Sequence, residues 1–543
     1  MASPLTYAGT ALAGVFTHVA YFNKGEHHLY GPLYLKLFFI TVMGATATLS
    51  YTHDVEWTTA LMTVSKVIGS YLLGIYGSLL VYRLFLHPLN KFPGAIGART
   101  SSLWLTLQLR NNNLHKKLVE LHQKHGQFVR IGSSDLSILN PKAIEIVYGP
   151  GSRCIKGTTY DLTRPTVSLQ LMRDHEEHHA RRRVWSGAFS DKLIRGYEQR
   201  VRGYRKKLVD RLTEMEGQPV NAKKWFNLYS FDVMGDLSFG KGFGSLERKE
   251  YHWAIRLLNA TTDFVGLYLP AWASLLLTRI PGAMTDFQKF LEFCGQRLME
   301  RFNNDPEIPD ISSSLFVPLE GRGITDITPE EENLLYGDAR LIVIAGSDTT
   351  SGALTTIFYE LVRKPEEIEK LRAELAQYVD DDKPDGEILH SKIAHLDHLN
   401  GVINEALRLY PAVPSGLQRL TPPEGIVIDG THIPGGVNIF CPLYALARSE
   451  MAYERPYEFI PERWYRSPEL VNDKTAFAPF SIGPFNCIGR PLALMNLRTT
   501  VARLIMEFDV KMAPGEDGSR FLENAKDNFV FYFGDLDLVF TRR

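Results

Sequence analysis

Hydrophobic positions are concentrated at the start of the chain, in three nearly unbroken apolar stretches. They cover residues 2–22, 32–51 and 60–84. Each is close to the ~20 residues that a helix needs to cross a bilayer. We therefore predict a membrane anchor over residues 1–86 with three transmembrane helices. A second interpretation keeps only the third stretch as a span and lays the first two in the membrane interface.

The lysines and arginines around these stretches predict their orientation. Residues 1–23 contain neither, Lys24 lies in the first loop, and the second loop again has none. Arg83, Lys91 and Arg99 follow the third stretch. Because basic residues favour the cytosolic side, we expect the amino terminus outside and the rest of the chain in the cytosol.

After the anchor, the pattern becomes that of a globular body. Residues 87–98 contain prolines, which cannot extend a helix, and they predict a stiff hinge before a large domain over 99–543. Short runs separated by turn residues predict strands. These strands are 127–131, 136–139, 426–428, 431–433, 528–533 and 536–540, with the last four forming two strand pairs.

One helix is predicted to be unusually long. Thr328 caps it, Pro329 occupies its first position and Glu331 completes a capping box. With no further proline until Pro365, the helix extends over about 35 residues, roughly 50 Å. Its middle reads Ala-Gly-Ser-Asp-Thr-Thr from residue 345. Helix propensity alone would not place these residue types there, and such local exceptions often mark function.

A single cysteine lies in a glycine-containing loop near the carboxyl end, Phe-Ser-Ile-Gly-Pro-Phe-Asn-Cys-Ile-Gly over residues 480–489. Gly483 and Gly489 permit sharp turns and close approach to a flat ligand. Cys487 stands just before a predicted helix over 491–508, whose positive end favours the thiolate. Such a thiolate is an axial ligand type for haem iron. The alternative is a buried structural cysteine.

The loop resembles the cysteine loop of the cytochrome P450 family, Phe-x-x-Gly-x-Arg-x-Cys-x-Gly, except that Phe485 replaces the usual arginine. The interior of the long helix matches the family's Ala/Gly-Gly-x-Asp/Glu-Thr-Thr/Ser, and Glu405 with Arg408 matches its Glu-x-x-Arg. The resemblance covers residues 87–543 and implies the cytochrome P450 fold, mainly α with small β-sheets, after an N-terminal transmembrane region.

The resemblance also implies roles for particular residues. Cys487 is expected as the axial iron ligand, while Asp348 and Thr349 bring protons to bound oxygen. With Phe485 in place of a cation, other side chains must bind the haem propionates. The implied propionate contacts are His178, Arg182 and Arg419; further haem contacts are Ala345, Gly346, Phe480, Gly483 and Gly489; the implied structural triad is Glu405, Arg408 and Arg463.

Composition excludes some partners. The 60 basic and 61 acidic residues nearly cancel, so no basic excess points to nucleic acid. The four cysteines are far apart in sequence, which excludes a CxxC metal site and a dense disulfide framework. This cysteine usage suits a reducing compartment.

The resemblance implies a haem-thiolate monooxygenase. Its cofactor is haem b, and it uses O2 with electrons from NADPH through NADPH–cytochrome P450 reductase, with cytochrome b5 as a second donor. The anchor implies a membrane location in the endoplasmic reticulum, with the catalytic domain facing the cytosol.

The implied substrate is a lipophilic small molecule, hydroxylated or epoxidised in fungal secondary metabolism, such as a terpenoid or prenylated aromatic compound. Segments at 155–172, 264–277, 341–344, 412–417 and 529–531 are expected to wall its pocket. Two alternatives stay open: a haem-thiolate isomerase or dehydratase, and a non-catalytic haem-binding membrane protein. The retained Asp348–Thr349 pair favours oxygenation, while Phe485 is the feature that favours the non-catalytic alternative.

Overall fold

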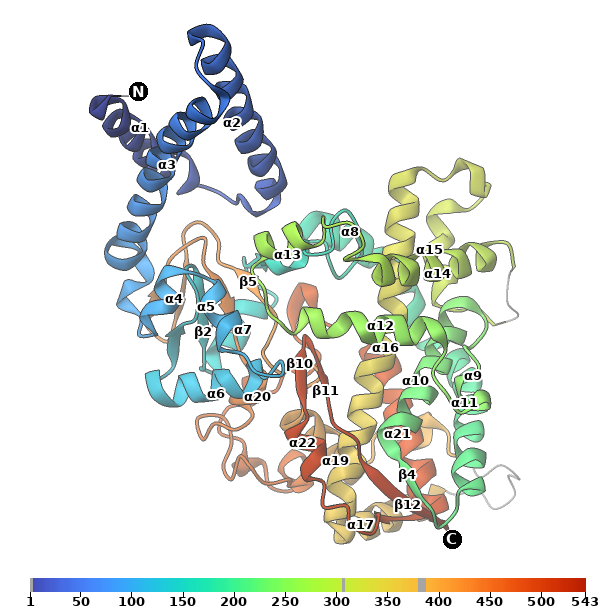
Figure 1. Cartoon of the computed structure of the whole chain (residues 1–543). Helices are drawn as coiled ribbons and strands as arrows, with labels where there is room; N and C mark the ends of the chain where they lie inside the picture. The colour runs from blue at the N-terminus through green and yellow to red at the C-terminus, as the bar shows by residue number, and fades with distance from the viewer. Residues whose placement is uncertain (1–2, 305–307, 379–386) are drawn as a thin grey trace.

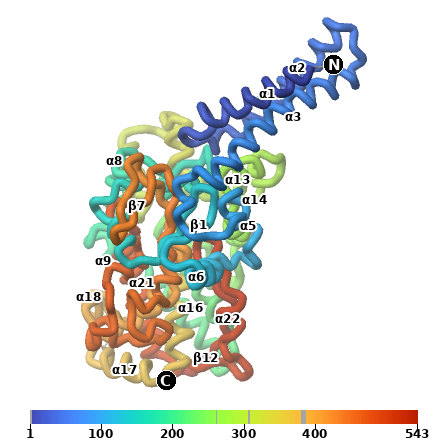
Figure 2. The backbone as a smooth tube through the Cα atoms, turned by 90° about the vertical axis from the view of Figure 1, so that its left-hand side faces the viewer, coloured from blue at the N-terminus to red at the C-terminus, as the bar shows by residue number. Residues whose placement is uncertain are grey.

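The computed structural model describes residues 3–304, 308–378 and 387–543, and consists of an N-terminal group of helices projecting from a large body (Figures 1 and 2). The N-terminal group is built from α1 (Pro4–Thr17), continued by a π-helical turn over His18–Phe22, α2 (Gly31–His53) and α3 (Trp57–Val81).

Within the described residues, two helices of this N-terminal group have the length and composition of a membrane span. They cover His28–His53 and Trp57–Lys91, and only 6% and 11% of their most apolar windows are buried. The helix over Pro329–Arg363 is nearly as apolar, but 72% of its window is buried inside the body. Its apolar residues therefore belong to the core. The first predicted stretch is the shorter helix α1, and residue 2, where that stretch was expected to begin, lies outside the described residues.

The helix α1 packs closely along α3 because glycines face the contact. A Cβ atom at Gly14 would lie 2.1 Å from the carbonyl oxygen of Tyr71, and one at Gly74 would lie 2.0 Å from that of Ala11. Small residues at such a crossing let two helix backbones approach closely. Ser78 Oγ also lies 2.9 Å from His18 Nδ1.

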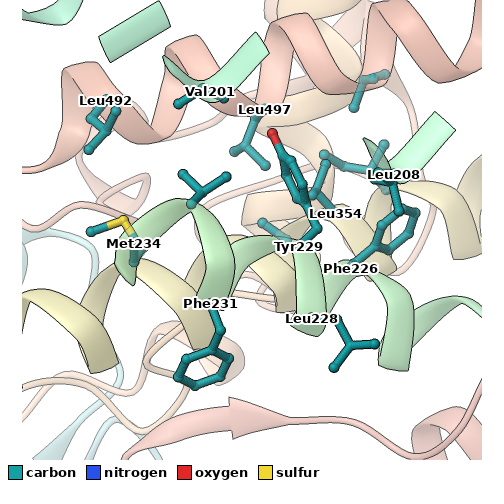
Figure 3. Close-up of a cluster of buried hydrophobic side chains, with 14 of the residues drawn as sticks. Val201, Leu208, Phe226, Leu228, Tyr229, Phe231, Met234, Leu354, Leu492 and Leu497 are labelled. Carbon is teal, nitrogen blue, oxygen red and sulfur yellow. The ribbon is translucent and has the colours of Figure 1, made fainter. Parts of the chain in front are cut away.

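The long helix predicted from its capping box is confirmed. It is α16, covers Pro329–Arg363, and has reciprocal capping bonds between Thr328 and Glu331. It crosses the body beside α10 (Ala222–Phe239), which is buried along most of its length (Figure 1). Side chains from α10, α16, α9 and α21 interdigitate in the core, including Phe226, Met234, Leu354 and Leu497 (Figure 3). The site is thus built on a rigid helical core.

The remaining helices complete the body (Figure 1). They are α4 (Ile96–Thr100), α5 (Leu103–Gln108), α6 (Leu114–His125), α7 (Lys142–Tyr148), α8 (His175–Ser186), α9 (Asp191–Glu214), α11 (Ser245–Arg248), α12 (Trp253–Val265), α13 (Ala271–Leu277), α14 (Thr285–Phe302), α15 (Ile311–Phe316), α17 (Pro365–Leu375), α18 (His390–Ile393), α19 (Asp397–Leu409), α20 (Leu443–Leu446), α21 (Arg490–Glu507) and α22 (Ser519–Glu523).

The largest sheet has the strand order β1-β2-β8-β5-β3 and includes both strands predicted around residues 127–139. Its members are β1 (Phe128–Arg130), β2 (Asp135–Ile138), β8 (Asn438–Phe440), β5 (Arg419–Leu420) and β3 (Ile155–Lys156). The predicted hairpin of β6 (Ile426–Ile428) and β7 (Thr431–Ile433) is also confirmed. Asp429 and Gly430 in its turn both have positive φ, as a primed turn requires.

The predicted pairing of the last two strands is wrong. Residues 526–532 fold back on themselves, so that β10 (Lys526–Asn528) pairs with β11 (Val530–Tyr532). Phe529 makes this tight turn with a φ of 72°, which no glycine or proline signals in the sequence. The last strand, β12 (Asp537–Arg542), pairs instead with β9 (Phe508–Met512) and β4 (Pro219–Asn221).

Candidate active site

The loop that carries Cys487 is fixed by its backbone. The Cys487 amide donates to the carbonyl of Phe480 at 2.8 Å, which closes the loop just before α21. Gly483 has a φ of +68°, and a Cβ atom there would lie 2.2 Å from the Tyr148 carbonyl at the end of α7. Gly483 is therefore required for the loop to pack on α7, and Phe480 acts here through its carbonyl.

Gly489 has a different role from Gly483. A Cβ atom there would lie 3.9 Å from both Cys487 Sγ and Phe189, with no closer contact. The protein would accommodate that carbon without strain, so its own packing does not demand glycine at this position. What the glycine does is keep the volume beside the sulfur clear, as a flat ligand bound to the sulfur would require.

Cys487 is the exposed cysteine among the four, and the other three are buried. The surrounding protein nevertheless raises the pKa of its thiol above the ordinary value, chiefly by burial. The amides of Gly489 and Arg490 and the charge of Arg182 act in the opposite direction and lower that pKa. The helix-end amides thus act in the predicted direction, toward the thiolate, while burial acts against them. A coordinated metal ion deprotonates such a thiol outright.

The middle of α16 is open on one side although most of the helix is buried. Ala345 is exposed and Thr349, one turn later, is half-buried. Thr349 Oγ1 donates to the carbonyl of Ala345 at 2.7 Å, a local bond back to the helix. These two residues line the face of α16 that is available to a ligand.

Gly346 lies on another face of α16. A Cβ atom there would lie 2.5 Å from Sδ and Cε of Met234 on α10, a side chain labelled in Figure 3. The structure thus explains this glycine by helix packing, whereas the sequence suggested an approach to a flat cofactor. Helix pairs that pack this closely require a small residue at the contact, which the sequence alone does not distinguish from a ligand contact.

Asp348 is buried, and its carboxylate contacts side chains of α10 and β11. Its Oδ2 accepts from the Tyr532 hydroxyl at 2.6 Å, and its Oδ1 from Asn227 Nδ2 at 3.2 Å. Burial raises the pKa of this carboxyl to about 6, although both hydrogen bonds lower it. An acid that titrates near neutrality can both donate and accept a proton at pH 7. Sequence reasoning missed Tyr532 and Asn227, since neither lies in a recognisable motif.

The raised pKa makes a prediction for stability. The carboxyl of Asp348 binds its proton more tightly in the folded chain than in the unfolded chain. Its contribution to the free energy of unfolding is therefore complete below pH 3.8, the ordinary pKa, and is lost as the pH rises through 6, the pKa in the folded chain. The loss amounts to about 3 kcal/mol at neutral pH. Asp348→Asn should therefore gain thermal stability relative to the native protein between pH 5 and 7.5, measured by unfolding of the holoprotein. A difference that stays constant with pH would contradict this.

Positively charged groups gather around the ring of Phe485. Arg419 is 1% exposed, its guanidinium lies 5.1 Å from the centre of that ring, and its Nε has no partner. Lys156 is 4% exposed and lies 4.7 Å from the same centre. Arg182 donates to the Asn486 carbonyl at 2.7 Å and also to the Asn486 side chain. No carboxylate in the described part of the chain pairs with these three cations.

His178 belongs to this cluster but does not add a charge. Its ring packs edge-on against Phe485 with centroids 4.6 Å apart. Burial, followed by the charges of Lys156, Arg182 and Arg419, lowers the pKa of His178 to about 3. It is therefore a neutral hydrogen-bonding group at pH 7.

These observations fit a flat, dianionic, metal-containing ligand. Buried cations are normally paired, so the unpaired guanidinium and ammonium indicate an anion that is not part of the protein. The thiol of Cys487 offers a metal ligand, the volume beside it at Gly489 is clear, and Ala345 on α16 is exposed. The donor set is that of a haem with its two propionates.

The predicted triad of Glu405, Arg408 and Arg463 is assembled in the structure. Glu405 accepts from Arg408 Nε and Nη2 at 2.9 and 2.8 Å and from Arg463 Nε at 3.2 Å. The indole of Trp464 donates to the same carboxylate at 2.9 Å, a partner that the sequence did not reveal. All three triad side chains are at most 2% exposed.

Glu405→Gln is expected to destabilise the fold by about 3–5 kcal/mol, because it leaves two guanidinium groups buried without a counter-charge. Thermal unfolding of the holoprotein would measure this loss. Glu369→Gln is the matched control, because Glu369 pairs with Arg372 at the same spacing but is 68% exposed. That surface pair is worth at most about 1 kcal/mol. Equal losses in both variants would contradict the account.

Comparisons with known proteins identify the family. The family model described as Cytochrome P450 matches residues 97–531. Cytochrome P450 monooxygenase notG' of Aspergillus versicolor is 47% identical over 546 residues, covering 100% of this chain and 99% of the relative. Tryprostatin B 6-hydroxylase of Aspergillus fumigatus is 45% identical over 544 residues, covering 99% and 96%.

A solved structure agrees with the fold. The haem domain of cytochrome P450DA matches with a TM-score of 0.67 and 19% identity, over 83% of this chain and 98% of that one. The sequence left three functions open: a monooxygenase, an isomerase or dehydratase, and a non-catalytic haem protein. One of these two relatives is named a monooxygenase and the other a hydroxylase, which agrees with the first function. The chain belongs to the cytochrome P450 family and is a haem-thiolate monooxygenase.

Proposed function

We propose that this monooxygenase hydroxylates a prenylated aromatic compound of fungal secondary metabolism. The observation that carries the proposal is the combination of Cys487, the Asp348–Thr349 pair and whole-length similarity to a hydroxylase named for tryprostatin B. Haem b, when bound, supplies the oxygen-activating chemistry and takes its electrons from NADPH through a reductase.

The chain's own residues would bind the haem iron and move protons toward it. Cys487 Sγ would ligate the haem iron, and the bond from the Cys487 amide to the Phe480 carbonyl holds the loop in place. Asp348 accepts a proton from the Tyr532 side and passes it toward the Thr349 hydroxyl. A cavity of about 10 Å³ is lined by both Asp348 and Thr349, which is close to the room needed for one water molecule between them.

The propionates are assigned to the cation cluster. Arg419 has an unpartnered Nε and Arg182 has donors beyond those used on Asn486, so each can donate to a carboxylate. His178 can add one neutral hydrogen bond. Ala345 and Gly489 are proposed as the small-residue contacts of the ring. Gly346, Gly483 and Phe480 are proposed to act indirectly, by letting α16 pack on α10 and by shaping the cysteine loop.

Turnover with tryprostatin B tests the function. The purified full-length protein, NADPH and an NADPH–cytochrome P450 reductase should convert this compound, or another prenylated aromatic in a small panel, to a product heavier by one oxygen atom. The matched compounds without the prenyl group should react far more slowly. Equal turnover of both sets, or none with any member, would overturn the proposed substrate class.

We also propose that α1, α2 and α3 all cross the membrane of the endoplasmic reticulum, with residues 1–86 as anchor, 87–98 as hinge and 99–543 in the cytosol. Since α1 packs along α3, a bilayer crossed by α3 surrounds α1 as well. The first loop also touches the body: Arg173 binds Glu26 at 2.6 Å, and His28 lies 2.9 Å from Asp161. The loop and the body must then lie on the same side.

Protease protection in sealed microsomes tests this topology. A tag at the amino terminus should be protected, while a tag at the carboxyl terminus is removed, because three spans place the two ends on opposite sides. Removal of both tags would contradict the proposed arrangement. On the cytosolic side, NADPH–cytochrome P450 reductase and cytochrome b5 are the proposed electron donors.

A further inference from the structure

Lys156 is a buried lysine with no acidic partner. Its ammonium donates to the carbonyls of Leu169 and Gln170 at 3.1 and 2.8 Å. An ammonium has three donors, so these bonds leave one unused. No carboxylate in the described residues pairs with it. Burial, followed by the charges of Arg419 and Arg182, lowers the pKa of this amine well below its ordinary value. An anion bound beside it would offset the cost of burial and keep the ammonium charged.

The sheet places a second cation directly opposite Lys156. On the antiparallel strands β3 and β5, Lys156 is the register partner of Arg419. Like charges opposite each other on paired strands are destabilising. Both side chains are also almost completely buried, where water does not screen their repulsion. A carboxylate between them would replace this repulsion with two charge-assisted hydrogen bonds.

Both cations also lie over one ring, that of Phe485, at 4.7 and 5.1 Å from its centre. Position 485 is the one at which the cysteine-loop pattern has an arginine. The face of a phenylalanine ring attracts cations but cannot donate to a carboxylate. Lys156 thus places its amine beside position 485, where the arginine of the pattern is missing.

We propose that Lys156 binds a haem propionate in place of the arginine that Phe485 replaces. This inference rests on the proposed haem site. The sequence had assigned residues 155–172 to the wall of the substrate pocket. Lys156 was not among the predicted haem contacts, because its neighbour Phe485 comes from a distant part of the chain.

Haem loss from the holoprotein to excess apomyoglobin tests the proposal, since it reports haem retention without turnover. Lys156→Met should lose haem at least about tenfold faster than the native protein, the effect of one charge-assisted hydrogen bond. The double variant Lys156→Met/Phe485→Arg should recover the native rate. Lys364→Met is the matched control: that lysine also donates to a backbone carbonyl, of Phe459 at 2.9 Å, but away from Phe485.

Reconstitution with haem dimethyl ester separates propionate binding from a structural role. The ester carries no carboxylate, so the native protein and Lys156→Met should then lose haem equally fast. A difference that persists with the ester would overturn the proposal, as would equal rates with ordinary haem. If Lys156→Met does not fold, the double variant decides: native-like retention supports the exchange of cations, and failure to hold haem contradicts it.

The outcome is distinguishable from failure of the proposed haem site itself. A native protein that binds no haem through Cys487 would overturn the site as a whole. A normal thiolate spectrum of the native protein, together with equal rates of haem loss from the native protein and from Lys156→Met, would overturn this inference alone.

Discussion

Cys487→Ser is expected to abolish both the thiolate spectrum and product formation. The hydroxyl of serine is far less acidic than a thiol and donates much less electron density to a haem iron. The sulfur's position depends on the amide bond to Phe480 and the clear volume at Gly489, and neither feature compensates for a lost ligand. The reduced, carbon-monoxide-bound spectrum and the yield of oxygenated product measure the two effects.

Two further variants make this result specific. Cys487→His should keep an iron ligand and haem but lose the red-shifted band, which separates loss of thiolate from loss of cofactor. Cys294→Ser changes a buried cysteine on α14 and should retain the band, despite a stability loss of about 1–3 kcal/mol from burying a hydroxyl. Oxygenation that survives Cys487→Ser would refute the assignment of the site.

Thr349→Ala is expected to lower the product formed per NADPH consumed by about a hundredfold, the scale of a lost proton donor. The missing electrons should appear as hydrogen peroxide. Thr349 lies on the open face of α16 beside Ala345, while Asp348, the acid that we propose supplies its proton, is buried. The hydroxyl is therefore the last proton-carrying group of this pair before the ligand side. Product, NADPH and peroxide measured in the same reaction give the coupling.

Thr355→Ala is the matched control for this variant. Thr355 lies on the same helix and its hydroxyl also bonds back four residues, to Ser351 at 2.7 Å, but it is fully buried. If Thr349→Ala acted only by changing the helix, Thr355→Ala would uncouple the reaction as well. Thr349→Ser should retain coupling. Native coupling in Thr349→Ala would remove the residue from the proton path.

Local patterns were enough to predict the elements that carry the site. The capping box at Thr328 fixes where α16 begins, and the absence of proline lets it continue to Arg363, so both ends were predictable. The cysteine loop and the Glu405 triad were predictable because their residues follow short motifs. Each of these features depends on neighbours in sequence or on a recurrent spacing.

What the sequence could not reveal depends on contacts between distant segments. Tyr532 reaches Asp348 only because β11 turns back at Phe529, a residue that does not mark turns. Gly346 matches the family motif, but the contact that leaves no room for a side chain at this position is with Met234 on another helix. The pairing of Lys156 with Arg419 is a register property of the sheet. Likewise, the balance between burial and helix-end amides at Cys487 depends on the packed surroundings, which no local pattern specifies.

The most direct test of the central claim is a reduced, carbon-monoxide difference spectrum of microsomes that contain the full-length native chain. We predict the red-shifted band of thiolate ligation, because Cys487 is accessible, its loop is fixed, and the cation cluster can hold the propionates without an arginine at position 485. A band typical of a neutral or histidine ligand, or no band, would contradict the assignment of Cys487 as the haem ligand.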